Sequence, residues 1–119
     1  MKYVQPLFFV LFLLTNFPVT SQEESNLQLT DIFDMEHISD PRISPDGTKI
    51  IYVRHFMDIM TDQTHSNLWI INTDGSRNRP LTQGNHRDYA PRWSHDGHKI
   101  AFLSNQQDDK VKLFVMYLD

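Results

Sequence analysis

The sequence predicts an all-β fold built from repeated sheets, and a duplicated segment, tight turns and apolar strands are the observations that predict it. The segment PRISPDGTKI, residues 41–50, is followed 50 residues later by PRWSHDGHKI, residues 91–100. Both copies lead into runs of β-branched and aromatic residues, which favour strands. Each copy also contains an Asp-Gly pair, which is typical of a tight turn between two strands. A strand–turn–strand unit is therefore expected twice.

The predicted strands are apolar on both of their alternating faces, which is typical of a sheet that lies between other layers. They cover residues 49–54, 67–72, 99–103 and 111–118. The Leu-Trp-Ile run at 68–70 matches Leu-Phe-Val at 113–115, so the loop between the strands is five residues shorter in the second copy. In the first copy we expect this loop, residues 56–66, to be polar and irregular.

Three Asp-Gly pairs are the predicted structural turns: Asp46-Gly47, Asp74-Gly75 and Asp96-Gly97. An aspartate side chain can accept hydrogen bonds from nearby backbone amides, and glycine adopts positive φ without steric cost. Pro45 precedes the first pair, whereas His95 takes the equivalent position in the second copy. The glycine is therefore the predicted constraint, and the proline assists it.

A repeat of 50 residues with four strands suits one blade of a β-propeller, because blade repeats span ~40–50 residues. We expect a partial β-propeller over residues 40–119, with blade one at 40–82 and an incomplete blade two at 90–119. The second copy lacks its fourth strand, and propellers close with ~4–8 blades. We therefore expect the chain to be part of a larger protein. The alternative, a small independent two-sheet domain, would leave apolar strands with an open edge.

The residues before the first copy predict an exported protein. Residues 1–21 combine Lys2, an apolar run at 7–14 and small residues before a polar stretch, which indicates a signal peptide. The run is shorter than the ~20 apolar residues that span a membrane. We expect a periplasmic or extracellular protein with no stable membrane anchor after cleavage. Residues 22–39 form a polar lead-in with a short helix, which Thr30 or Asp31 can cap.

Composition removes several functions from consideration. A formal net charge of −4 argues against a nucleic-acid partner, and zero cysteines exclude disulfides and thiolate chemistry. The histidines show no metal-ligand spacing, and no G-x-S-x-G nucleophile motif occurs. We therefore predict no catalytic, cofactor-binding or metal-binding residue, and no cofactor. The kinase-like tripeptide His86-Arg87-Asp88 is interpreted as coincidence, and Trp69 and Trp93 as core residues.

Three segments carry a resemblance to a known family: DPRISPDGTKIIYV, NLWIINTDGSRNRPLTQG and APRWSHDGHKIAFLSN. They resemble the propeller repeats of prolyl oligopeptidase family serine peptidases, especially the acylaminoacyl-peptidase and dipeptidyl-aminopeptidase-like enzymes. In that family the propeller filters access to a C-terminal α/β-hydrolase domain that carries the catalytic triad. The resemblance therefore implies a serine peptidase that acts on peptides and whose catalytic residues lie outside this chain.

The same repeat is similar to that of TolB-like periplasmic propellers, which are non-enzymatic scaffolds that bind protein partners. Those proteins place a separate α/β domain before the propeller, whereas here a short helix directly precedes blade one. This feature favours the peptidase. A TolB-like scaffold and a propeller attached to another hydrolase remain as alternatives.

Overall fold

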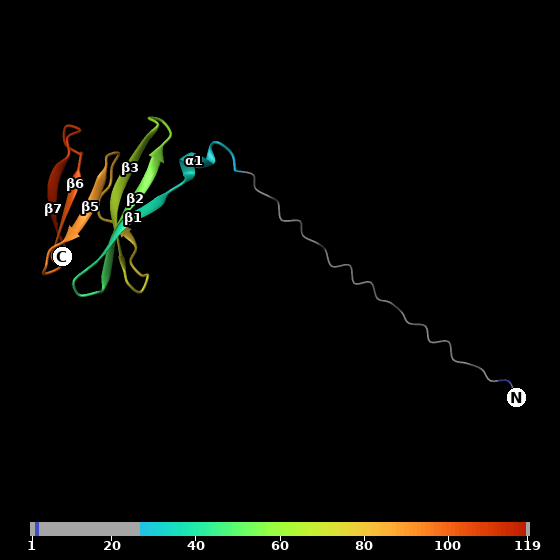
Figure 1. Ribbon diagram of the computed structural model, residues 1–119, viewed down its shortest axis with the longest axis horizontal. Coiled ribbons are helices and arrows are strands. Elements are labelled where there is room, and N and C mark those ends of the chain that lie inside the picture. Colours follow the sequence, from blue (N-terminus) through green and yellow to red (C-terminus); the bar gives the residue numbers. More distant parts are fainter. Residues whose placement is uncertain (1, 3–26, 119) are drawn as a thin grey trace.

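The computed structural model describes residues 2 and 27–118, which form a short helix followed by two antiparallel sheets (Figure 1). The predicted all-β partial propeller is thereby confirmed, while the predicted signal peptide lies outside the described residues apart from Lys2. The elements are α1 (Asp31–Asp34), β1 (His37–Ile43), β2 (Lys49–Asp58), β3 (Gln63–Asn72) and β4 (Arg79–Pro80) in the first unit, and β5 (Asp88–Trp93), β6 (Lys99–Ser104) and β7 (Lys112–Tyr117) in the second. No helix among the described residues is long and apolar enough to cross a membrane.

In both sheets the strands follow one another in chain order, β1-β2-β3-β4 and β5-β6-β7. The register of β1 against β2 shifts between Ser39 and Arg42, and that of β5 against β6 shifts at the equivalent place 50 residues later. Each shift contains a residue with positive φ, namely Asp40 at 47° and Ala90 at 53°. The repeat therefore extends from the sequence to a β-bulge in the first strand of each sheet.

Strand pairing confirms the predicted five-residue difference between the copies. Val53 pairs with Leu68 in the first sheet, and Leu103 pairs with Leu113 in the second. Leu103 lies 50 residues after Val53, whereas Leu113 lies 45 residues after Leu68. The two blades thus have the same strand register. The five-residue difference lies in the β6–β7 hairpin, which is shorter than the β2–β3 hairpin.

The core lies between the two sheets, and the two faces that meet there are not equivalent. Its buried members are Ile51, Val53, Leu68 and Ile70 of the first sheet, with Ile100 and Phe102 of the second. Ile51 is the counterpart of Ala101 in the repeat, not of Ile100, so one face of blade one packs on the opposite face of blade two. This head-to-tail stacking leaves the next face of blade two available to a further sheet.

That next face is bare among the described residues. Leu113 and Val115, on β7, are 69% and 54% exposed, whereas their counterparts Leu68 and Ile70 are 0% and 4% exposed. The same side-chain chemistry is thus packed in one blade and open to solvent in the other. A further sheet of the same kind would bury it.

The predicted polar loop at residues 56–66 is wrong. β2 continues to Asp58 and β3 already begins at Gln63, so the two strands form a long hairpin with ten registered pairs (Figure 1). Polar residues such as His65 occupy these ladder positions, so the apolar pattern fades while the backbone pairing continues. β1 begins at His37, three residues before the predicted start of blade one, because the bulge at Asp40 interrupts its strand pattern.

The predicted short helix spans one turn, Asp31–Asp34. Of the two predicted capping residues, Thr30 occupies the N-cap position, but its side chain makes no cap hydrogen bond. Asp31 instead accepts a hydrogen bond from the Gln28 amide at its Oδ2, with a length of 2.7 Å. Met35 is already extended, and the chain passes directly into β1.

The positive φ of Ala90 yields a test of the bulge. A left-handed conformation costs an L-residue ~1–2 kcal/mol relative to glycine. We therefore expect Ala90→Gly to raise the free energy of unfolding of the longer protein by about 1 kcal/mol in urea denaturation. Ala101→Gly, in the regular strand β6, should lower it. Equal destabilisation by both changes would contradict the bulge geometry.

The bare face of β7 yields a second test. Residues 27–118 expressed alone should self-associate, because Leu113 and Val115 present apolar surface at an uncovered sheet. Replacing both residues by lysine should lower the average mass in sedimentation equilibrium. The equivalent change in blade one, Ile70→Lys, should abolish folding by placing a charge in the core. A monomeric unmodified segment with a sharp thermal transition would refute this expectation.

Candidate functional site

The first Asp-Gly turn is built around one carboxylate oxygen. Asp46 Oδ1 accepts hydrogen bonds from the Ser44 hydroxyl at 2.6 Å, the Thr48 amide at 3.0 Å and the Thr48 hydroxyl at 2.8 Å. The Ser44 and Thr48 hydrogen bonds lower the pKa of Asp46 to about 2. Gly47 follows with φ of 74°, a conformation that favours glycine. The carboxylate therefore remains ionised and organises the turn.

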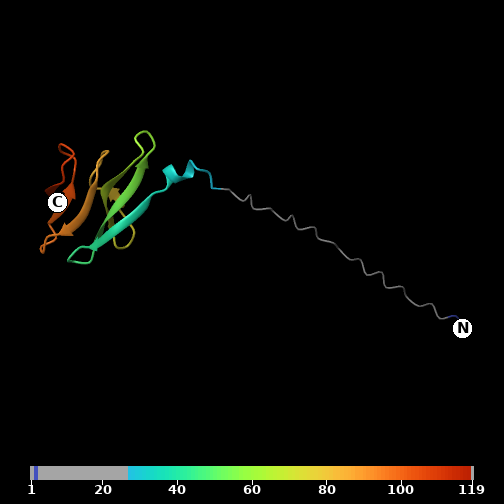
Figure 2. The same cartoon turned by 45° about the horizontal axis from the view of Figure 1, so that its top comes forward.

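The second turn repeats this arrangement 50 residues later. Asp96 Oδ1 accepts hydrogen bonds from the Ser94 hydroxyl and the His98 amide, and these lower its pKa. Gly97 has φ of 75°. Figure 2 shows the β1–β2 and β5–β6 turns at the same end of the two sheets. His95 and His98 are exposed beside this turn.

The third turn, in blade one only, uses Asp74. Its Oδ1 accepts hydrogen bonds from the Ser76 hydroxyl at 2.6 Å and the Ser76 amide at 2.9 Å, and these lower the pKa of Asp74. Gly75 adopts φ of 87°. The structure thus places all three predicted Asp-Gly pairs at turns.

Trp93 and a shared carboxylate join the blades at the edge formed by their first strands. The indole Nε1 of Trp93 donates a hydrogen bond to the Arg42 carbonyl at 3.0 Å, and its ring packs against the core as predicted. Arg42 Nε donates to Asp40 Oδ1 at 2.7 Å, and Arg92 Nη1 donates to Asp40 Oδ2 at 3.0 Å. Burial tends to raise the pKa of Asp40, but the two arginines outweigh it and lower the pKa. The sequence missed this acid because it lies in a bulge.

At the other end, a buried polar cluster holds the crossover between the blades. The Ser66 hydroxyl donates to the Asp88 carbonyl at 2.8 Å, and the Ser66 amide donates to the His86 carbonyl at 3.0 Å. The Asp88 side chain is fully buried, and its Oδ2 lies 3.0 Å from His86 Nε2. His86 and Asp88 of the kinase-like tripeptide therefore have structural roles at this crossover.

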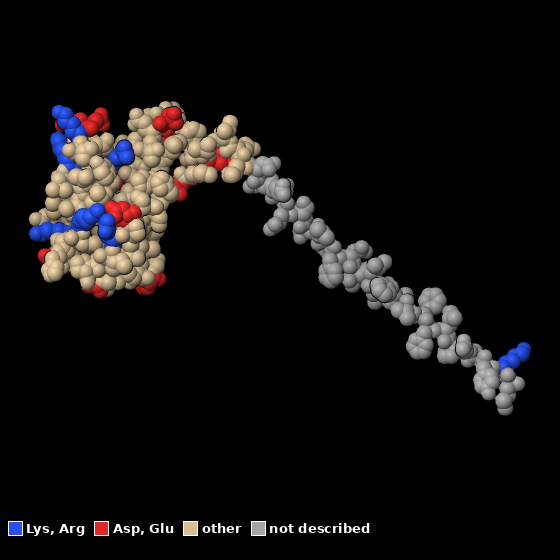
Figure 3. Space-filling model, in the orientation of Figure 1, with Lys and Arg blue, Asp and Glu red and all other residues tan. Residues whose placement is uncertain are grey.

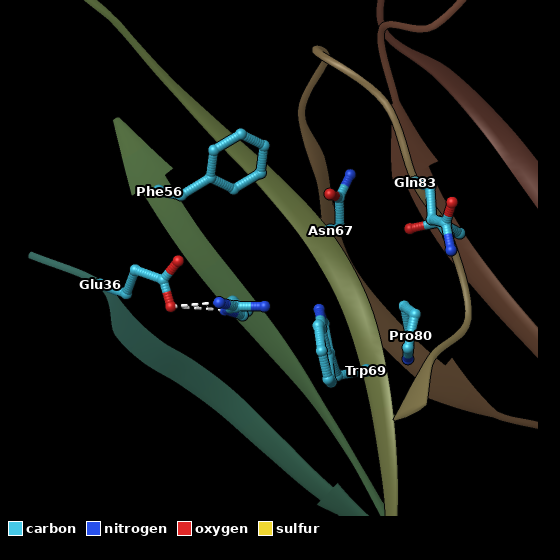
Figure 4. A pocket seen from close by; sticks show the side chains of 8 residues that line it. Glu36, Phe56, Asn67, Trp69, Pro80 and Gln83 are labelled. Atoms are coloured by element: carbon cyan, nitrogen blue, oxygen red, sulfur yellow. Dashed lines mark hydrogen bonds and ion pairs between the residues drawn. The ribbon is translucent and has the colours of Figure 1, made fainter. Parts of the chain in front are cut away.

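A shallow hollow of about 310 Å³ lies on the outer face of blade one (Figure 4). Trp69, Phe56 and Pro80 supply apolar surface there, and the Arg54 guanidinium lies 4.6 Å from the centroid of the Trp69 ring. Arg54 also pairs with Glu36. Trp69 is thus half-buried in a hollow rather than in the core, which corrects its predicted role. The hollow can accommodate a packing partner but has no pair of groups for acid–base catalysis.

A serine–histidine pair lies on β1 and β2, although no sequence motif marks it. Ser39 Oγ lies 2.7 Å from His55 Nε2, and His55 stacks on His37 at a ring separation of 4.3 Å. Burial, together with the charges of His37 and Arg87, lowers the pKa of His55. No carboxylate of the described residues orients His55 in the manner of a catalytic triad. The pair therefore joins the edge strand β1 to β2.

The geometry defines the class of the protein: a four-stranded and a three-stranded antiparallel sheet of the same register, stacked unlike face to unlike face, are blades of a β-propeller. The described residues contain no group of three or more His, Cys, Asp or Glu side chains that could bind a metal ion.

Comparisons with known proteins identify the family. The chain is 37% identical over 86 residues to the uncharacterized peptidase YuxL of Bacillus subtilis, and this match covers 72% of the chain and 13% of the relative. It is 36% identical over 72 residues to dipeptidyl-peptidase 5 of Porphyromonas gingivalis, covering 60% of the chain and 10% of that enzyme.

A solved acylaminoacyl peptidase, in complex with Z-Gly-Gly-Phe-chloromethyl ketone, has the same fold over 75% of this chain and 13% of its own, with a TM-score of 0.62 and 21% identity. No protein-family model matches. The chain is thus a portion of a prolyl oligopeptidase family peptidase, and it spans about an eighth of the length of the first of these relatives.

The turn geometry predicts a specific acid sensitivity. Because the pKa of folded Asp46 is about 2, below the ordinary 3.8, its contribution to stability is present above pH 3.8 and is lost as the pH falls toward about 2. Asp46→Ala should lower the thermal midpoint at neutral pH, and its difference from wild type should shrink across that window. Asp34→Ala, an exposed acid on α1, is the matched control. A difference that is constant with pH would rule out the proposed role of the carboxylate.

Proposed function

We propose that this chain is the propeller portion of an exported serine peptidase and that the propeller controls the access of peptides to a hydrolase domain elsewhere in the longer protein. Two relatives whose names describe them as peptidases support the chemistry. The observation that carries the proposal is the duplicated blade, which has an open apolar face and the same fold as part of an acylaminoacyl peptidase.

The arrangement of the blades supports a role in access. β1 and β5 are the first strands of adjacent blades, and they contact each other at one edge of the stack. Repetition of this contact around an axis would surround a narrow opening with first strands. An opening of this kind would admit extended peptides and exclude folded proteins. Export would follow from the predicted signal peptide at residues 1–21.

Activity of the longer protein provides the first part of the test. A fluorophosphonate that labels activated serines should modify the purified protein, and short peptides should be cleaved while folded proteins resist. A protein that neither reacts nor cleaves would favour a TolB-like scaffold. In that case, proteins captured by a crosslinker from the periplasm would be the expected partners.

A variant at the blade junction provides the second part. Ile100→Ala should loosen the core between the blades, at a cost of ~2–5 kcal/mol for such a truncation. We expect several-fold faster cleavage of long or partly folded substrates and an unchanged kcat for a dipeptide substrate. Ile43→Ala, at a residue that is 64% exposed, is the control and should change neither rate. Equal slowing of all substrates by Ile100→Ala would contradict control of access by the propeller.

A further inference from the structure

Two arginines from equivalent positions of the repeat meet at one carboxylate. Arg42 lies on β1 and Arg92 on β5, the first strands of the two blades. Asp40 receives one arginine at each of its oxygens, Arg42 at 2.7 Å and Arg92 at 3.0 Å. The two guanidinium groups are therefore held on either side of a single carboxylate, 50 residues apart in the chain.

The cluster carries a surplus of positive charge. Its three groups sum to a net charge of +1, because Asp40 stays ionised between the two arginines. Ala90 occupies the position equivalent to Asp40 in the second blade, so Arg92 has no matching acid in its own blade. Figure 3 shows basic and acidic side chains side by side over β1 and β5, at the surface of the molecule.

Each arginine also keeps an edge that can bind a ligand. Arg42 uses its Nε on Asp40, and Arg92 uses its Nη1 on Asp40 and on the Pro91 carbonyl at 2.7 Å. Within residues 27–118, no acceptor is hydrogen-bonded to the Nη1–Nη2 edge of Arg42 or to the Nε–Nη2 edge of Arg92. The two side chains are 44% and 54% exposed. A guanidinium edge of this kind binds a carboxylate through two parallel hydrogen bonds.

We propose that Arg42 and Arg92 form a binding site for the carboxylate of a peptide. Asp40 fixes the two guanidinium groups in place, and the incoming carboxylate neutralises the remaining positive charge. The ligand carboxylate can come from a peptide C-terminus or from an acidic side chain, which share the same chemistry. If the proposed function holds, this site lies on the path of peptide substrates, and that placement rests on the proposed function. The binding of a carboxylate does not depend on it.

The test measures binding by the longer protein after its serine nucleophile has been blocked with a fluorophosphonate. Acetyl-Ala-Ala, its C-terminal amide, and the amide of acetyl-Glu-Ala are titrated calorimetrically at low salt, because salt screens exposed charges. We expect acetyl-Ala-Ala to bind and its amide to give no signal. Binding of the acetyl-Glu-Ala amide would extend the site to acidic side chains, and its absence would restrict the site to C-termini.

Variants separate binding from structural support. Arg92→Gln and Arg42→Gln should each weaken the binding of acetyl-Ala-Ala on the order of tenfold, the effect of losing hydrogen bonds to a charged group. Arg79→Gln, on β4 at the opposite edge of the first sheet, removes the same type of side chain and should leave affinity unchanged. The thermal midpoint of each variant shows whether its fold is intact. If one glutamine variant does not fold, the other still tests the site.

Two results would overturn the site: equal binding of the acid and its amide, or unchanged affinity in both folded glutamine variants. Because binding is read without turnover, a protein that binds acetyl-Ala-Ala but cleaves no peptide would refute the proposed peptidase and retain the site. A protein that cleaves peptides but shows no difference between acid and amide would refute the site alone.

Discussion

Burial of apolar side chains between unlike faces of two sheets is the interaction on which the rest of the structure depends. Among the described residues, six buried side chains from both sheets form that core, and each fully buried aliphatic or aromatic side chain contributes ~1.5–3 kcal/mol. Because the two faces differ, the contact cannot close on itself as a symmetric pair of sheets would. Each added sheet presents the next face again, so the contact favours growth around an axis. The exposed Leu113 lies on the face that such an added sheet would cover.

Polar contacts around this core decide how the sheets are aligned, because apolar burial alone is not directional. Trp93 donates its indole hydrogen to the Arg42 carbonyl at one end of the contact, and Ser66 binds the backbone of the crossover at the other. Asp40 ties the two first strands together through two arginines. The Ser66 bonds satisfy polar groups that the junction buries, and together with the exposed contacts of Trp93 and Asp40 they help to align the blades.

The sequence allowed prediction of the features whose cause is local. The turn at Asp46-Gly47 follows from the preferences of two neighbouring residues, and its repetition identified the blade. The extent of the β2–β3 hairpin could not be predicted in this way, because polar side chains such as His65 lie on a backbone ladder that needs no apolar pattern. The contacts of Arg92 with Asp40 and of Ser66 with the Asp88 carbonyl are set by the packing of two blades, which no single stretch of sequence encodes. Trp69 was misplaced because an aromatic strand residue looks the same whether its face is covered or open.

A comparison of equivalent positions in the two copies separates residues that the fold requires from residues that can serve a function. Where the fold imposes a requirement, both copies keep the same chemistry: serine and aspartate recur in both turns with the same bonds. The bulge requires a backbone conformation but no particular side chain, and there the copies differ, with Asp40 in one and Ala90 in the other. The arginines that follow at positions 42 and 92 are retained, although only the first has an acid in its own blade. Asp40 alone pairs with both arginines, so the cluster keeps a net positive charge and guanidinium edges with capacity for a ligand.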